Sequence, residues 1–223
     1  MMKAIFYKEW IKTYRYGLLM LATLWAFVGY CLLTMHRIAE LKGANHLWET
    51  MLQRDAIFID RLRYLPLLAG VLFALVQFVP EMHRKCLKLT LHLPCSTHRV
   101  LWGMLLSGVG LLLGCFFTCF LWLHFGMSEL LAWELERHIL WSAAPWFLAG
   151  LAGYLLTGWI VLEPTWKRRV LNLAVAVLLL RIFFVSDTPE AYVPYMPLWM
   201  VGTAVTACLS WLSVERFKAG RQD

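Results

Sequence analysis

Six long apolar runs dominate this sequence of 223 residues, and each is long enough to cross a lipid bilayer as a helix. The hydrocarbon core of a bilayer is about 30 Å thick, which a helix of roughly 20 apolar residues spans. Five of the runs carry no charged residue, and one carries a single charge, Arg181. The runs are residues 17–35, 64–80, 100–128, 139–162, 170–186 and 191–214. We therefore predict an all-α fold, a polytopic membrane protein with six transmembrane helices.

The polar segments between these runs are too short to fold as separate domains. The longest is the predicted large external loop, residues 37–63, and a chain below about 40 residues rarely forms a stable core of its own. The hydrophobic fraction of 61% and the twelve tryptophans fit a body embedded in lipid with aromatic residues at its interfaces. We therefore expect residues 1–223 to form a single transmembrane domain.

The basic residues are shared unequally between the two sides of the predicted bundle. Six spans place both termini on one side, together with the second and fourth connections. That side holds fourteen of the 21 Lys and Arg residues, in segments 1–16, 81–99, 163–169 and 215–223. Cytoplasmic loops of membrane proteins carry such an excess. This distribution explains the net charge of +7 without nucleic acid as a partner, and it predicts a multi-pass protein of the cytoplasmic (inner) membrane with both termini cytoplasmic.

Residues 1–16 have the pattern of an amphipathic helix. At 100° per residue, apolar side chains share one face and basic side chains share the other. The apolar face has Met2, Phe6, Trp10 and Tyr14, and the basic face has Lys8, Lys12 and Arg15. Such a helix suits the anionic headgroups of the inner leaflet, so we predict an N-terminal amphipathic interfacial helix. The alternative is a basic leader that only helps to orient the first span.

The segment 81–99 joins the second and third predicted spans on the cytoplasmic side. Glu81 ends the span, a short basic and leucine-rich helix follows, and Pro94 ends that helix. Ser96 or Thr97 can then cap the next helix. The apolar residues of the short helix include Leu87, Leu91 and Leu93. These side chains can enter a groove of a partner protein, although a turn that merely anchors at the membrane surface has the same pattern.

At these residues the chain resembles the membrane subunits of ATP-binding-cassette transporters, in particular the type-2 exporter permease family. That family has a glutamate at the inner end of the second span, then a helix that leads to a Leu-Pro-small-Ser turn. The matching residues here are Glu81, Leu87, Leu91, Leu93, Pro94 and Ser96. Lys85-Cys86 stands where members often carry Gly-Thr, which allows a more continuous helix. The N-terminal helix, the six spans and the large first external loop extend the resemblance over nearly the whole chain.

The resemblance implies that residues 81–99 are a coupling segment, seated in a groove of a separate ATPase subunit. It also implies that the chain is the transmembrane permease domain of an exporter, completed by a second permease subunit that is the same or a related chain. ATP and Mg would be bound by the partner ATPase. This sequence lacks a Gly-x4-Gly-Lys-Ser/Thr loop and paired ionisable residues at its span centres, so we expect no enzyme, cofactor or metal site in it.

The family lines its transport path with the second and fifth spans. The resemblance therefore nominates Gln77 and Asn172, the uncharged polar residues of those spans, as possible pathway residues. An ordinary hydrogen bond between helices explains both equally well. Arg181, near the external end of its span, is either a further pathway residue or an anchor that reaches the interface. The alternative to a transporter subunit is a non-transporting membrane scaffold or assembly component.

Two glycine pairs predict close contact between helices. Gly110 and Gly114 are four apart in the third span, and Gly150 and Gly153 are three apart in the fourth. Small residues at such spacing let two helix backbones approach each other. We expect both pairs to pack within the subunit rather than between subunits.

The predicted topology can be tested by cysteine labelling in a background without native cysteines. Single cysteines at Asn45 and Thr188 should react with an impermeant reagent added to intact cells, because both residues fall in predicted external segments. Cysteines at Thr97 and Gln222 should react only after the membrane is permeabilised. External labelling at Gln222 would contradict the even number of spans.

Overall fold

The part of the chain that the structure describes is helical throughout. The structure, a computed structural model, describes residues 2–43, 59–83, 96–186 and 188–218, and no β-strand occurs in these residues. Its α-helices are α1 (Met2–Lys42), α3 (Leu65–His83), α5 (Thr97–Ser128), α6 (Trp133–Leu162), α7 (Trp166–Ile182) and α8 (Met196–Lys218). Two short 3-10 helices, η1 (Asp60–Leu62) and η2 (Val193–Tyr195), precede α3 and α8. The predicted all-α fold is confirmed.

Among the residues that the structure describes, five helical segments are long and apolar enough to cross a membrane. They are Lys3–Leu41, Asp60–His83, Thr97–Ser128, Trp133–Leu162 and Val193–Lys218. The chain is therefore a multi-pass helical membrane protein by the length and composition of its helices. The helix expected as the fifth span, α7, has 17 residues, which is slightly below the roughly 20 of a usual span. The sixth span therefore stays a prediction.

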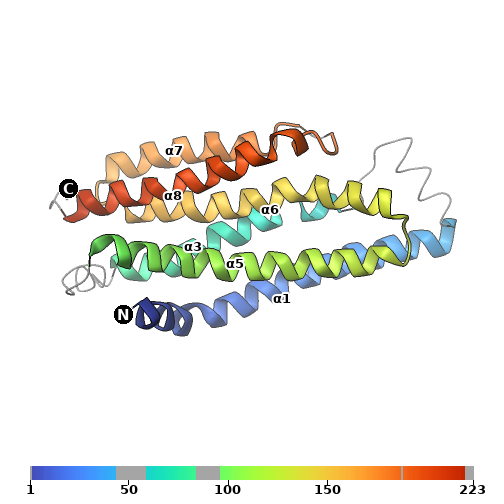
Figure 1. Cartoon of the computed structure of the whole chain (residues 1–223), viewed down its shortest axis with the longest axis horizontal. Helices are drawn as coiled ribbons and strands as arrows, with labels where there is room; N and C mark the ends of the chain where they lie inside the picture. Colours follow the sequence, from blue (N-terminus) through green and yellow to red (C-terminus); the bar gives the residue numbers. More distant parts are fainter. Residues whose placement is uncertain (1, 44–58, 84–95, 187, 219–223) are drawn as a thin grey trace.

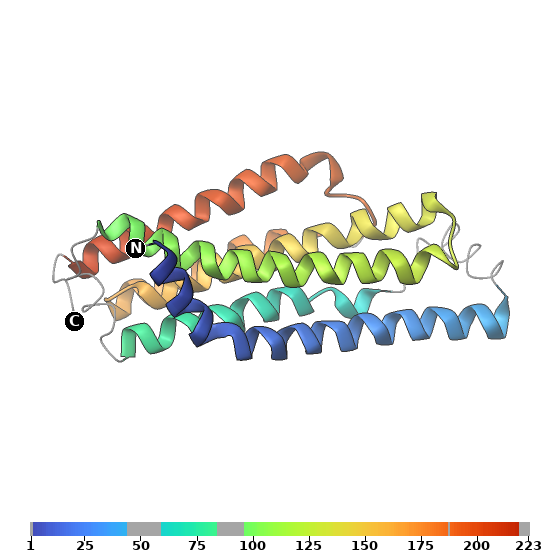
Figure 2. The ribbon, with the colours of Figure 1, turned by 60° about the horizontal axis from the view of Figure 1, so that its bottom comes forward.

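The helices lie side by side in one elongated bundle, with α6 at its centre (Figure 1). Helix α6 packs against α3, α5, α7 and α8, and α1 packs against α5 and α3. The start of α1, the end of α3, the start of α5 and the end of α8 all lie at one end of the bundle (Figures 1 and 2). We name this the inner end, after the predicted orientation, and the opposite end the outer end.

Helix α1 joins two elements that the sequence analysis treats separately. The expected interfacial helix and first span form one continuous helix, and the first turns run at a steep angle to the rest (Figure 2). The helix also extends past residue 35 to Lys42, so the start of the expected external loop, 37–63, is helical. Residues 60–62 of that loop form η1, and 44–58 lie outside the described residues.

The closest approach of two helices in the bundle depends on glycine. A Cβ atom on Gly70 of α3 would overlap the backbone carbonyl of Gly150 in α6, and one on Gly150 would lie 2.6 Å from the Pro66 carbonyl oxygen. A Cβ on Gly153 would lie 2.7 Å from the Leu67 side chain. The predicted packing of the pair in the fourth span within the subunit is confirmed, with α3 as its partner.

The other glycine pair behaves differently. A Cβ on Gly110 or Gly114 of α5 would meet no atom within 4 Å in the described part of the chain. The expectation that this pair packs within the subunit is therefore wrong. The reason is geometric, because both residues are exposed on a side of α5 that no helix of the described residues covers.

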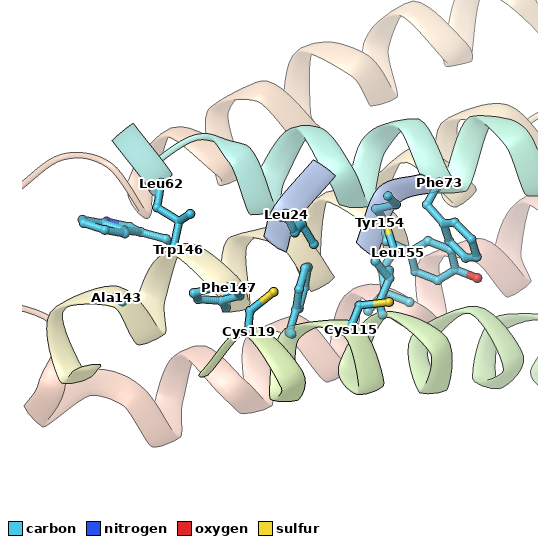
Figure 3. Close-up of a cluster of buried hydrophobic side chains, with 14 of the residues drawn as sticks. Leu24, Leu62, Phe73, Cys115, Cys119, Ala143, Trp146, Phe147, Tyr154 and Leu155 are labelled. Atoms are coloured by element: carbon cyan, nitrogen blue, oxygen red, sulfur yellow. The ribbon is translucent and has the colours of Figure 1, made fainter. Parts of the chain in front are cut away.

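Buried side chains from α1, α3, α5, α6, α8 and η1 fill the centre of the bundle, and Figure 3 shows part of this cluster. The Phe147 ring of α6 meets the Phe116 ring of α5 edge-on and the Phe120 ring at a tilt, with ring centroids 5.2 and 4.5 Å apart. Cys115 and Cys119 of α5 are buried in the same cluster as free thiols. In an apolar environment free cysteine packs as a small hydrophobic residue, and this is its role here.

We predict that Gly70→Ala destabilises the protein because the new methyl group forces α3 and α6 apart. Overpacking of this kind usually costs about 1–3 kcal/mol. Gly202→Ala is the matched control, since a Cβ at Gly202 of α8 meets nothing within 4 Å and alanine favours a helix. Thermal unfolding in detergent should show a lower midpoint for Gly70→Ala alone. Equal midpoints for the two variants would contradict the close crossing.

Candidate functional site

Two carboxylates are buried near the inner end of the bundle, where α1 and α3 meet. The residue exposure of Glu9 in α1 is 0%, and that of Glu81 in the last turn of α3 is 3%. A buried carboxylate without a partner is costly, because it loses its hydration. Partners are therefore required, and two lysines of α1, Lys8 and Lys12, supply them.

The lysines and carboxylates form a compact, charge-balanced cluster. Lys12 Nζ lies 2.8 Å from Glu81 Oε1 and 3.2 Å from Glu9 Oε2. Lys8 Nζ lies 3.0 Å from Glu81 Oε1 and 3.9 Å from Glu9 Oε1. Two positive charges thus compensate two negative charges. The arrangement binds the first turns of α1 to the end of α3.

Gln77, one helical turn before Glu81, extends this cluster into the bundle. Its Nε2 donates to Glu9 Oε2 and to the Met104 carbonyl oxygen of α5, both at 2.9 Å. Its Oε1 accepts a hydrogen bond of 2.8 Å from the Tyr154 hydroxyl of α6. Gln77 and Tyr154 are both fully buried. One side chain of α3 therefore makes hydrogen bonds to three other helices.

We call this set the inner-end network. Its members are Lys8, Glu9, Lys12, Gln77, Glu81 and Tyr154. The network needs a glycine at position 108 of α5, because a Cβ there would overlap the Tyr154 hydroxyl and the side-chain Oε1 of Gln77. Gly108 thus creates the space in which the hydrogen bonds between α3 and α6 form.

A third buried carboxylate joins the remaining helices at the inner end. Glu163 follows α6 and is fully buried. Its Oε2 accepts from the Ser213 hydroxyl at 2.6 Å and from Arg216 Nη1 at 3.2 Å, both in α8. Its Oε1 accepts from Thr165 at 3.1 Å, and its backbone oxygen accepts from Arg169 of α7 at 2.7 Å. Glu163 therefore joins the ends of α6, α7 and α8.

The outer end has two histidine–carboxylate pairs. His124 of α5 contacts Glu136 of α6, and His138 Nδ1 of α6 lies 3.2 Å from Glu190 Oε1. The Glu190 backbone N–H also donates to the Ser142 hydroxyl at 3.1 Å. These contacts hold the start of α6 to the end of α5 and to the segment before α8.

The structure describes only two residues of the predicted ATPase-coupling set. Glu81 lies at the end of α3, as expected, and its side chain is part of the inner-end network. Ser96 has the N-cap position of α5 with extended backbone angles, but its side chain makes no capping hydrogen bond. Leu87, Leu91, Leu93 and Pro94 lie outside the described residues.

The three possible pathway residues do not come together. Gln77 makes its hydrogen bonds to α1, α5 and α6. Asn172 of α7 is 5% exposed and lies one turn before Ala176, which packs with Leu156 and Trp159 of α6. Its Nδ2 has no hydrogen-bond partner in the described residues. Arg181 is exposed in the last turn of α7 and does not point into the bundle.

The apolar and basic pattern of the sequence does not reveal the contacts of the inner-end network. It does not point to Glu9 or Tyr154, and it assigns Lys8 and Lys12 to lipid headgroups, whereas both lysines contact buried carboxylates. The sequence does contain a pointer to this arrangement, since Glu9 is the one acidic residue among the basic residues of segment 1–16. Glu163 could have been found in the same way, as a carboxylate at the end of an apolar run.

Comparison with known proteins adds no relative from which the site could be interpreted. No protein-family model, curated protein or solved structure matches the chain. The described residues also contain no group of three His, Cys, Asp or Glu side chains that could hold a metal ion. The inner-end network is therefore interpreted from its own geometry, as a mechanical connection of four helices.

We predict that Gln77→Leu lowers stability more than Tyr154→Phe does. The first variant removes three buried hydrogen bonds, one of them to a charged acceptor. The second removes the two bonds of the Tyr154 hydroxyl, both to neutral acceptors, and the one to the Leu105 carbonyl oxygen is long at 3.4 Å. A buried polar group left without a partner costs about 1–3 kcal/mol, and a neutral hydrogen bond contributes about 1 kcal/mol. Thermal unfolding in detergent measures both variants.

The matched control for this comparison is Tyr195→Phe in η2, where the side chain is 58% exposed. It should leave the unfolding midpoint unchanged. A Gln77→Leu variant as stable as Tyr195→Phe would show that Gln77 does not connect the helices.

Proposed function

We propose that this protein is the membrane subunit of an ATP-binding-cassette transporter, an exporter, and that it couples ATP hydrolysis by a separate ATPase subunit to movement of a substrate across the cytoplasmic membrane. One observation carries the proposal. Glu81, in the last turn of α3 before the leucine-rich segment 84–95, is bound through the inner-end network to three further helices. The resemblance of residues 81–96 to a coupling segment supports the same function.

A force applied to residues 84–95 would reach several helices. Residues 84–95 connect α3 directly to α5, so any displacement of the segment acts on the ends of both helices. The ion pairs of Glu81 pass part of that force to α1, and Gln77 passes part of it to α6. A partner that moves this one segment would therefore move four helices as a unit.

The working unit in this proposal contains two permease subunits and two ATPases. Each permease crosses the membrane six times, with α7 as the fifth span, and both termini are cytoplasmic. ATP and Mg bind to the ATPases, and closure of the ATPases moves the two coupling segments. The substrate passes between the permeases. Of the possible pathway residues, Arg181 is exposed at the end of α7, whereas Gln77 and Asn172 are buried within the subunit.

A co-purification experiment tests whether an ATPase binds the segment. Tagged wild-type protein solubilised from its native membranes should retain an ATP-hydrolysing subunit with a phosphate-binding loop, identified by mass spectrometry. Leu91→Asp should reduce the recovered ATPase by at least about tenfold, because it places a charge in an apolar contact. Lys167→Gln, at the start of α7 on the same end, should not. Equal recovery from all three proteins would favour the scaffold alternative.

A second variant separates docking of the ATPase from transmission of its movement. Glu81→Gln weakens the ion pairs to Lys8 and Lys12 but leaves the leucines of the segment in place. The ATPase should still be recovered, whereas ATP should no longer change the pattern of cysteine cross-links between two copies along α3 and α7. Glu215→Gln, an exposed carboxylate of α8 at the same end, is the control. A nucleotide response unaffected by Glu81→Gln would refute the proposed role of the network.

A further inference from the structure

The basic residues of the first turns of α1 fall into two groups. Lys8 and Lys12 point toward α3 and are compensated by Glu9 and Glu81. Lys3 is exposed on another face of the helix, and in the described part of the chain no carboxylate lies within ion-pair distance of it. An uncompensated ammonium at the end of an apolar bundle favours an anionic ligand.

Lys3 lies at the end of a long groove between α1 and α5. The groove consists of two adjoining hollows of about 620 and 410 Å³, which share Trp10, Gly110 and Leu111 as lining residues. Lys3 and Ser107 line the first hollow, and Gly114 and Thr118 line the second. We name the two hollows together the α1–α5 groove.

The α1–α5 groove has the shape and chemistry of an acyl-chain site. Its walls are mainly apolar and aromatic, and the glycines at 110 and 114 leave open space where side chains would otherwise stand. From Ser107 to Thr118 the helix rises about 16 Å, at roughly 1.5 Å per residue. One leaflet of the hydrocarbon core is about 15 Å deep. A lipid tail that enters at the inner end would fill the length of the groove.

We propose that the α1–α5 groove binds one anionic phospholipid of the inner leaflet. Its phosphate lies near the Lys3 ammonium, and one acyl chain runs past Trp10 along the open surface at Gly110 and Gly114. The site selects an anionic over a zwitterionic headgroup because no carboxylate of the described residues compensates Lys3. A second copy of this chain is a weaker fit, since a helix packed on the glycines would leave that charge uncompensated. The site is independent of the proposed transport function.

The test measures lipids retained by the whole purified protein. Detergent-solubilised, delipidated protein is titrated with phosphatidylglycerol or phosphatidylcholine, and native mass spectrometry counts bound lipids and protein copies. Wild-type protein should bind one phosphatidylglycerol several-fold more tightly than phosphatidylcholine. Lys3→Gln should weaken phosphatidylglycerol binding about fivefold, the usual effect of one lysine near an anionic surface. Lys167→Gln, which removes an exposed charge at the start of α7, should not.

Leucine substitutions test the acyl-chain part of the groove. The double variant Gly110→Leu/Gly114→Leu should fold, because both positions are open, and should lose binding of both lipids. Gly202→Leu, at an equally open position of α8, should bind like wild type. Equal affinity for the two lipids, or binding unchanged in the double variant, would refute the site. So would a wild-type dimer that the double variant converts to a monomer, since the face would then be a protein interface.

Discussion

The architecture of this bundle depends on the burial of Glu9 and Glu81. Each carboxylate lies where hydration is lost, so each must be compensated by charges from the protein itself. Lys8 and Lys12 provide those charges only if the first turns of α1 lie against the end of α3. The position of the first turns of α1 therefore follows from an electrostatic requirement, whereas the rest of the helix is held by its buried apolar residues. The steep angle between the first turns and the rest of α1 meets this requirement while the remainder packs along α5 (Figure 2).

Helix α6 connects two groups of helices at the inner end, and each group is held together by its own polar contacts. On one side, Tyr154 reaches the inner-end network through Gln77. On the other side, Glu163 at the end of α6 holds α7 and α8 through Ser213, Arg216 and the Arg169 contact to its backbone. The glycines of α6, Gly150 and Gly153, let α3 pack closely against α6 on the side of the inner-end network. Because both groups are tied to α6, a displacement at the inner end is shared by the bundle instead of ending in one helix.

The helical fold followed from the sequence, whereas most of the site did not. Apolar runs of span length set the helices, because a bilayer or a bundle core requires backbone hydrogen bonds to be satisfied internally. The two glycine pairs show where local pattern fails. Both have small residues at helix-packing spacing, yet Gly150 lies against α3 and Gly110 lies against no helix of the subunit. The partner of a helix face is encoded by the rest of the chain, so spacing alone cannot identify it. The burial of Glu9 cannot be predicted from its own segment for the same reason, because its buried partner, Gln77, lies on another helix.

The composition of the inner-end network suits a contact that changes during function. Replacing a buried ion pair by apolar residues often leaves stability unchanged or improves it, so stability alone does not explain why charges stand here. The side chains of Lys8 and Lys12 are 42% and 23% exposed, whereas those of both carboxylates are almost fully buried. The exposed lysines can return to water, but the contact separates at modest cost only if Glu81 is hydrated at the same time, while Glu9 keeps its hydrogen bond from Gln77. A purely apolar contact would have no comparable alternative state, because separating it exposes surface without any compensating hydration. In the proposed coupling to an ATPase, such a contact can separate at its exposed side while Gln77 still holds α3 to α1, α5 and α6.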